Sequence, residues 1–431
     1  MIHGGVEVQV VDRLDDLPGI AAAWRELQDA CEHKHVFLDH RFIAAWWRHA
    51  GHGKSMHTLA LRRGNAVVGV VPLALSHGWE AFPTSEKNVR IADDFQYLSS
   101  LRWRRVVPIR RLSFPLSFPS ANLRAHFLLR QAESSAIEAV LAYCHSIRDR
   151  WDILAFDGIP SGSAQEAILC NVAGDFGLRP GKSRRERTLL HATLPDSMDA
   201  FLGQRSRNFR SSYRRALRQS MERAGQFQIR EFRRDLIDEG IEKLLALERQ
   251  SWKAANTRQR TLHVTLNEGY RRFHRDVARA FAASDQAQVL VTEIGGHPVN
   301  ALYSLEREDV VACVLTFQAE ATAQQVSLAP LWGRFFEGAI ARGRRVVHFN
   351  GNSDHLARMA NGHDTFSRVT LYHQGIYSSC LRRMADTAHA LAHLSRRWSD
   401  HDARLPSTSA ASVPRVANVS ACTSSGSNRI P

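Results

Sequence analysis

Five side chains in the second half of the sequence could take a proton from an amine or a hydroxyl group. They are Glu248, Glu293, His348, Asp354 and His363. Glu248 precedes Trp252 by one helical turn, so the two side chains are predicted to share a helix face. Asp354 follows an expected strand that ends in Asn350-Gly351, and sites in open α/β sheets lie at such strand ends. We expect Glu248 or Asp354 to be a general base, acting directly or through a water, with a purely structural role as the alternative for each.

Three polar or aromatic residues beside these carboxylates could contact the molecule that loses the proton. Trp252 and Lys253 lie about one turn beyond Glu248 on the expected helix, and Asn350 ends the expected strand before Asp354. Trp252 would serve equally well as a core residue. We expect all three to contribute to substrate binding.

A second feature is a helix that begins near residue 327 and could hold a phosphate group. The N-terminus of a helix offers unpaired backbone N–H groups and the positive end of the helix dipole. Small residues would allow a phosphate to approach the backbone, and the residues expected to contribute are Gln325, Ser327, Leu328 and Ala329. An ordinary serine N-cap is the alternative interpretation of the same pattern.

Arginines crowd the stretch from residue 205 to residue 223, where only Glu222 opposes them. We expect Arg207, Arg210 and Arg214 to help bind an anionic substrate, with at least one of them facing a cleft between two halves of the protein. The alternative is a solvated helix face in a protein whose basic residues are mostly arginine.

The sequence lacks the motifs of several other enzyme classes. The sequence has no GxSxG nucleophile elbow, no GxGxxG turn and no Walker P-loop. Its six cysteines include no CxxC pair, so neither a zinc site nor a disulfide framework is expected.

The elements that would position these residues recur in the same order in both halves of the sequence. Each half reads strand, helix, helix, hairpin, helix, strand, with an irregular insertion at about residues 76–122 of the first half. Gly64 and Gly295 occupy corresponding hairpin turns, and both final strands end in Asp-Gly or Asn-Gly. We therefore predict an internal duplication. One long helix is expected at residues 197–223.

Length and composition agree with this organisation. The chain has 431 residues, 44% hydrophobic and 23% charged, with 57 Lys and Arg against 43 Asp and Glu. This is the composition of a globular protein of two or three domains. No membrane-spanning run or signal peptide is evident, so a cytoplasmic location is expected. We predict halves at residues 1–190 and 191–378, a basic amphipathic helix at 379–402 that packs on its own domain or lies on a membrane, and a disordered tail at 403–431.

In this order and spacing the motifs resemble the GNAT acetyltransferase superfamily, specifically its double-GNAT branch related to FemABX transferases and labelled cellulose-biosynthesis-type acetyltransferases. The resemblance covers about residues 6–375. It is carried by the following segments: Trp24-Arg25-Glu26-Leu27, Trp46-Trp47, residues 68–73, the arginine-rich helix, residues 247–253, and the second hairpin with its following helix and strand. Two segments depart from the pattern. Ser327-Leu328-Ala329-Pro330 replaces a Ser-Pro-Gly helix start, and residues 354–358 replace a Tyr-Lys pair.

The resemblance implies an α/β fold of two tandem GNAT-like halves with mixed sheets, followed by a C-terminal helix and a disordered tail. It implies acetyl-CoA or another acyl-CoA as co-substrate, without a metal, with the donor site in the second half and the acyl group near residues 314–316. The acceptor would be an amine or hydroxyl of a small molecule, a saccharide or an envelope or exopolysaccharide precursor. Peripheral association with an envelope-synthesis complex would fit the same resemblance.

Two alternatives remain open from the residues. One is a non-catalytic basic adaptor that binds nucleic acid or an envelope complex through the arginine-rich helix. The other is a FemX-like transferase that takes its acyl group from an aminoacyl-tRNA. Nucleic acid is otherwise not an expected partner.

Overall fold

The computed structural model describes residues 1–390 except 32–34, 83–104, 116–123, 125, 182–184, 223–226, 252–267, 324–325, 352 and 388–389. Residues 1–389 form one compact unit. The predicted tail at 403–431 and the end of the predicted helix at 379–402 lie outside the described residues.

The strands of the first half form a mixed sheet in which the last pairing is parallel. Its strands are β2 (Val6–Val11), β3 (Ser55–Arg63), β4 (Ala66–Phe82), β5 (Arg105–Ser113) and β7 (Ile153–Pro160). Neighbours pair antiparallel from β2 to β5, and β5 then pairs parallel with β7. Short strands flank this set: β1 (Ile2–His3) and β6 (Leu128–Leu129). Strand β5 lies within the stretch where an irregular insertion was expected.

The second half repeats this pairing order. Its strands are β10 (Phe227–Phe232), β11 (Ala287–Ile294), β12 (His297–Arg307), β13 (Val310–Gln318) and β14 (Val346–Phe349). Neighbours pair antiparallel from β10 to β13, and β13 pairs parallel with β14. The predicted α/β fold with mixed sheets and an internal duplication is therefore confirmed.

The two hairpins agree in detail. Gly64 and Gly295 both adopt the left-handed conformation, with φ of 59° and 56°, which glycine tolerates without strain. Each hairpin then has a β-bulge at the same distance beyond its glycine, at Val68 and at Val299, where the strand registers shift. These positions confirm the predicted correspondence of the two turns.

Two strands exchange places between the halves and join all the strands into one sheet. β9 (Arg185–Thr193) follows the first half in the sequence but pairs with β14 of the second. β15 (Gly362–Tyr372) follows the second half but pairs with β7 of the first, and β9 and β15 pair with each other. β8 (Arg179–Pro180) adds a short pairing to β15. The sequence did not predict β15. The proposed boundary between residues 190 and 191 falls inside β9, and the division into halves at that boundary stays a prediction.

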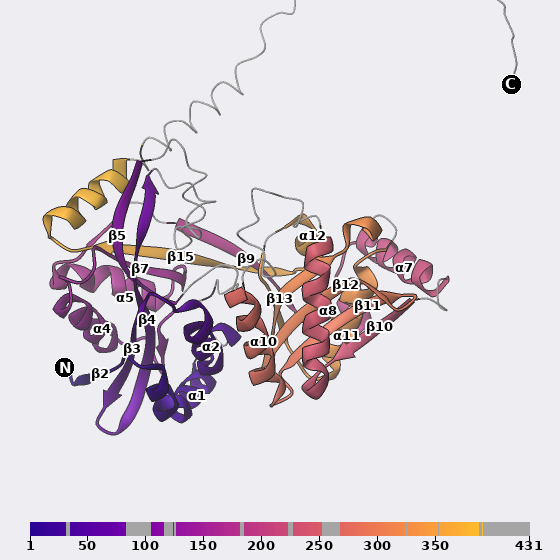
Figure 1. Ribbon diagram of the computed structural model, residues 1–431, viewed down its shortest axis with the longest axis horizontal. Helices are drawn as coiled ribbons and strands as arrows, with labels where there is room; N and C mark the ends of the chain where they lie inside the picture. Colours follow the sequence, from indigo (N-terminus) through magenta and orange to yellow (C-terminus); the bar gives the residue numbers. More distant parts are fainter. Residues whose placement is uncertain are drawn as a thin grey trace, which may run out of the picture. The chain divides into compact units, whose positions relative to one another are not determined.

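Helices cover both faces of the sheet (Figure 1). On one face lie α1 (Ala21–Ala30), α2 (His40–Ala50), α8 (Ile237–Gln250) and α10 (Glu268–Ala282). On the other lie α4 (Ser134–Ser146), α5 (Ala164–Val172) and α11 (Ala329–Ala341). Alternate strand residues serve the two faces: in the second half Ala312 packs with α8 and α10, whereas Val311 packs with α11.

The core beneath α1, α2, α8 and α10 runs without interruption from one half to the other. α2 and α10 lie side by side, and the rings of Phe42 and Phe273 meet edge to face with centroids 5.2 Å apart. Burial of a shared core explains why residues 1–389 form one unit.

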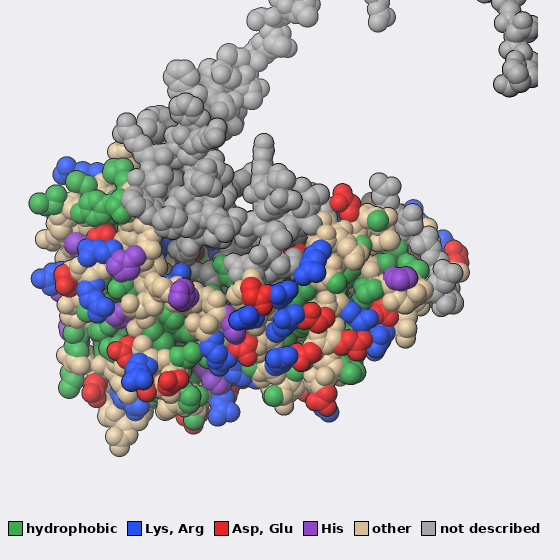
Figure 2. Space-filling view, in the orientation of Figure 1, with side chains coloured by type: hydrophobic (Ala, Val, Ile, Leu, Met, Phe, Trp, Pro, Cys, Tyr) green, Lys and Arg blue, Asp and Glu red, His purple; other side chains and the backbone are tan. Residues whose placement is uncertain are grey.

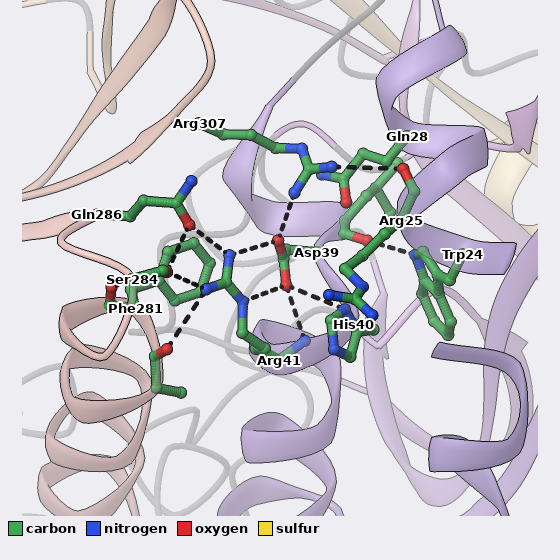
Figure 3. Close-up of polar contacts among 12 residues, drawn as sticks. Trp24, Arg25, Gln28, Asp39, His40, Arg41, Phe281, Ser284, Gln286 and Arg307 are labelled. Atoms are coloured by element: carbon green, nitrogen blue, oxygen red, sulfur yellow. Dashed lines mark hydrogen bonds and ion pairs between the residues drawn. The ribbon is translucent and has the colours of Figure 1, made fainter. Parts of the chain in front are cut away.

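A buried ionic network reinforces this junction (Figure 3). Asp39, which is fully buried, accepts from Arg41 Nε and Nη2 at 2.9 Å each and from Arg307 Nη1 at 2.8 Å. Arg41 in turn donates to Gln286 Oε1 at 2.8 Å and stacks its guanidinium 3.9 Å above the ring of Phe281. Burial would raise the pKa of Asp39, but the hydrogen bonds and charge of Arg41 hold that pKa below its usual value.

The single helix predicted at residues 197–223 is wrong, because the chain forms α6 (Met198–Gly203) and α7 (Arg207–Glu222) instead. The Ser206 side chain accepts from the Phe209 N–H and begins a second helix, as N-caps do. Arg205, between the two helices, is buried with its guanidinium 4.1 Å above the Phe201 ring.

α7 packs closely on α11 at a glycine. A Cβ at Gly333 would lie 2.1 Å from the Tyr213 hydroxyl and 2.9 Å from two of its ring carbons. We expect Gly333→Ala to destabilise the protein by about 1–3 kcal/mol through overpacking. Gly338→Ala on the same helix meets only the end of the flexible Arg342 side chain at 3.0 Å, so it should be neutral or stabilising by up to about 1 kcal/mol. Urea unfolding of both variants would test this contact, and equal stability changes would contradict it.

Residues 376–387 are helical and pack on the first half. Tyr377 donates to the Pro108 carbonyl at 2.6 Å, and Leu381 is buried beside Ile109 and Ile153. Of the two arrangements expected for the C-terminal helix, the described part shows packing on the protein. Within the described residues, no helix has the length and apolar character needed to cross a membrane.

Candidate active site in the second half

The sheet of the second half opens at one end between β13 and β14. These strands pair in parallel only from Val310 with Val346 to Cys313 with Phe349, and β13 then continues to Gln318. A β-bulge at Val314, where Tyr303 pairs with Leu315 but Ser304 with Cys313, lies at the point where the parallel pairing stops. A bulge leaves backbone groups outside the strand ladder and turns the strand, and bulges are common beside active sites.

The first half has no such opening among its described residues. Strand β5 pairs with β4 without a register shift, and its parallel pairing to β7 reaches its last residue, Ser113. The two halves therefore differ at the position where β13 and β14 separate. This difference supports the second half as the location of the active site.

The helix that follows the opening begins where the sequence predicted a phosphate contact. α11 starts at Ala329, whose N–H donates to Ser327 Oγ at 3.1 Å. Among the described residues, no acceptor is present for the backbone N–H groups of Ser327, Leu328 and Leu331. Pro330 has no N–H to offer. Ser327, Leu328 and Ala329 thus lie at a helix start with the polarity that favours anions, whereas Gln325 lies outside the described residues.

The loop before α11 is held against the sheet by two amides. Gln318 Nε2 donates to the Val326 carbonyl at 2.7 Å, and Asn300 Nδ2 donates to the Ser327 carbonyl at 3.5 Å. Gln318 is the last residue of β13, so these contacts fix the start of α11 beside the open end of the sheet.

Glu248 lies on the face of the sheet opposite α11. It is 2% exposed in the last turn of α8, which packs across β11, β12 and β13. The core that α8 shares with these strands includes Val314 and Phe317 of the open strand. The structure therefore brings a buried carboxylate to the helix that covers the opening, and its role as base stays a prediction.

The other predicted acid–base and substrate residues are distributed unevenly. Asn350 directly follows β14, and neither its Oδ1 nor its Nδ2, both shielded from solvent, finds a partner among the described residues. Asp354 is the first residue of α12 (Asp354–Ala357), close behind Asn350 in the chain. Trp252 and Lys253 lie outside the described residues.

The three remaining acid–base candidates occupy other positions. Glu293 is buried in an ion pair with Lys243 at 2.9 Å, which favours a structural role. His363 is exposed on β15. His348 lies on β14 and lines a cavity that the sequence did not predict.

The arginine-rich surface of α7 differs from the expectation of a cleft between halves. Arg207, Arg210 and Arg214 line an open hollow of about 500 Å³ with Ser211, Arg215 and Arg218, all from α7 itself. No residue of the first half contributes to it, because α7 packs against α11 within the second half. The hollow contains no carboxylate, whereas Figure 2 shows acidic and basic side chains intermixed on the face over α8 and α10. Anion binding by these arginines stays a prediction.

Comparison with known proteins agrees with the resemblance. Residues 207–358 match the family model described as acetyltransferase (GNAT) domain. No curated protein matches the chain. A crystal structure of FemX has a similar fold, with a TM-score of 0.53 and 10% identity, over 84% of this chain and 96% of that one.

Two other solved structures are more distant. A tandem GNAT protein from the clavulanic acid biosynthesis pathway has a TM-score of 0.45 and 12% identity, over 85% of this chain and 98% of that one. The C-terminal domain of a putative lysylphosphatidylglycerol synthetase from Agrobacterium fabrum has a TM-score of 0.48 and 13% identity, over 86% and 96%. The family match places a GNAT-type domain at residues 207–358, which lie within the second half of the chain.

Proposed function

We propose, from the GNAT acetyltransferase domain that this chain contains, that the protein transfers an acyl group from acyl-CoA to an amine or hydroxyl. The observation that carries the proposal is the bulged end of β13, which no longer pairs with β14, beside the start of α11. The donor pyrophosphate would rest on the N–H groups of Ser327, Leu328 and Leu331, where the helix dipole favours negative charge. The thioester would then lie in the opening near Val314.

Glu248 would accept the proton that the attacking group loses, directly or through a water. Asn350, whose two amide atoms have no partner within the described part of the chain, would bind the acceptor beside the opening. An envelope or exopolysaccharide precursor is the acceptor that the resemblance suggests. The transfer test is release of the CoA thiol from a panel of acyl-CoAs offered with amine and sugar acceptors, and no release with any pair would count against the proposal.

Donor binding has its own test at Ser327. Ser327→Asp places a carboxylate where the pyrophosphate would lie, so the affinity for acetyl-CoA should fall by at least about tenfold, or 1.4 kcal/mol. Ser197→Asp is the matched control, because Ser197 is also an exposed serine that begins a helix of the second half, α6. Calorimetric titration of both variants should show the loss only at Ser327; an equal loss in both would mean that the charge acts at long range.

A second candidate function follows from the arginine hollow on α7. Five arginines on one exposed helix face could bind the phosphates of an RNA, which would fit a transferase that uses an aminoacyl-tRNA donor. Binding of total tRNA that weakens steeply with salt and is lost when Arg210, Arg214 and Arg218 are replaced by Gln would favour this donor over acyl-CoA.

A further inference from the structure

A cavity of about 560 Å³, lined by several charged residues and histidines, lies at the junction of the two halves, where the exchanged strand β15 passes beside the second half. Among the described residues, the first half contributes His35, Arg124, His126 and Pro160 to its lining. The second half contributes Glu308, Asp309, Val310, Val346, His348, Asp364 and Phe366. The volume is that of a small-molecule site.

Arg124 is the unusual member of this lining because it is only 2% exposed and only part of its guanidinium is hydrogen-bonded. Its Nη1 donates to Asp364 Oδ2 at 2.5 Å, and its guanidinium lies 4.9 Å from the centre of the Phe366 ring. Its Nε and Nη2 are shielded from solvent and have no acceptor among the described residues. A buried hydrogen-bond donor without an acceptor lowers the stability of the fold by about 1–3 kcal/mol, and by more when it is charged. A ligand that accepts hydrogen bonds from this edge of the guanidinium would remove that cost.

The geometry of that edge selects the ligand group. Nε–H and Nη2–H point in parallel along one side of the planar guanidinium and match the two oxygens of a carboxylate or phosphate. The edge that faces Asp364 is already occupied. An incoming oxyanion would therefore pair with Arg124 without displacing Asp364.

The surrounding charges favour a carboxylate that is accompanied by an amine. Asp364, Glu308 and Asp309 line the same cavity, so the carboxylates outnumber the single arginine. Burial would raise the pKa of Asp364, but the charge and hydrogen bond of Arg124 outweigh it and keep this carboxyl ionised. Burial and the charge of Arg124 hold the pKa of His348 well below its usual value, so this histidine adds no positive charge at neutral pH. A phosphate dianion would meet this excess negative charge, whereas an ammonium group would be stabilised by it.

The cavity lining includes residues of β14, the strand that borders the proposed transfer site. His348 is two residues before Asn350 on the strand that borders the opening, a separation of about 7 Å in an extended chain. A ligand of amino-acid size held by Arg124 could place its amine at the open end of the sheet.

We propose that this cavity binds the acceptor, and that the acceptor is an amine bearing a carboxylate which pairs with the free edge of Arg124. This proposal rests on the proposed acyl transfer. In the reaction the bound ammonium first releases one proton to solvent and becomes a free amine. The amine nitrogen then forms a bond to the thioester carbonyl carbon and the carbon–sulfur bond breaks. The nitrogen loses one proton to the base, and the CoA thiolate leaves and takes up a proton.

The test uses the full chain without acyl-CoA and measures melting temperature with amino carboxylates and their amides at constant ionic strength. The probes are glycine, β-alanine, L-alanine and L-glutamate at about 20 mM, with glycinamide, β-alaninamide, L-alaninamide and inorganic phosphate for comparison. At least one amino carboxylate should raise the melting temperature by about 2 °C or more, whereas its amide and phosphate should not. No stabilisation by any amino carboxylate, or equal stabilisation by phosphate, would overturn the proposal.

Arg124→Lys keeps a charge beside Asp364 but removes the two parallel donors, so it should fold and lose the stabilisation. Arg110→Lys is the matched control, because Arg110 also pairs with an aspartate, Asp152 at 2.7 Å, but does not line the cavity. An unchanged response in Arg124→Lys would equally overturn the proposal. Failure of the wild type to bind acyl-CoA would remove the proposed function but would leave this ligand test unaffected.

Discussion

Glu248→Gln should slow acyl transfer by about 10²–10⁴-fold and leave donor binding intact, because the amide keeps the shape of the side chain but cannot take a proton. Glu248 is 2% exposed on the helix that covers the open strand β13, whereas the donor is expected at the start of α11 on the other face. Turnover and acyl-CoA affinity should be measured separately on the same preparation.

Glu242→Gln is the matched control on α8, since Glu242 is exposed and pairs with Arg275 of α10. It should retain wild-type turnover. Asp354→Asn tests the second candidate base, which lies behind Asn350 in the chain. Wild-type turnover in Glu248→Gln together with a loss in Asp354→Asn would reassign the base, and full activity in both would exclude a carboxylate base at either position.

Asp39→Ala should lower the free energy of unfolding by about 3–5 kcal/mol, because it leaves the charges of Arg41 and Arg307 buried without their partner. Asp276→Ala is the control at the same junction. Asp276 also joins α10 to α2, through Arg48 and His49, but its side chain is 33% exposed, so a change of about 0–1 kcal/mol is expected. Urea unfolding would compare them, and similar losses would mean that the buried network contributes no more than a surface pair.

The same carboxylate predicts the direction of a pH effect. The pKa of Asp39 is lower in the folded protein than its usual value, so its stabilisation is fully present above the unfolded pKa of about 3.9 and is lost as the pH falls through the folded pKa. The wild type should therefore lose stability below about pH 4 more steeply than Asp39→Asn. Parallel acid profiles for the two proteins would contradict this assignment.

Features set by local sequence were predictable here. The hairpin turns follow from glycines at Gly64 and Gly295 between alternating apolar residues, and the start of α11 at Ala329, near the expected Ser327, follows from its small residues. Strand β5 was not predicted, because Arg105–Ser113 contains three basic residues and a proline that hide its alternation.

Features set by distant pairing were not predictable. β15 finds its partners in β7 and β9, about 200 residues away along the chain, and the pair of Arg124 and Asp364 spans a similar separation. The bulge at Val314 depends on the register between β12 and β13, which no single segment specifies. The sequence therefore predicted which segments form the candidate site. The opening between β13 and β14 and the cavity lined by Arg124 could be identified only in the structure.

Hydrogen–deuterium exchange of the full chain with and without millimolar acetyl-CoA tests most directly whether the second half binds the acyl donor. If it does, exchange should slow at residues 314–318 and 326–331, where the open strand and the start of α11 would contact the donor. Residues 107–113 of β5, the counterpart strand in the first half, should be unaffected. Protection confined to the first half, or no protection at residues 314–331, would contradict the account.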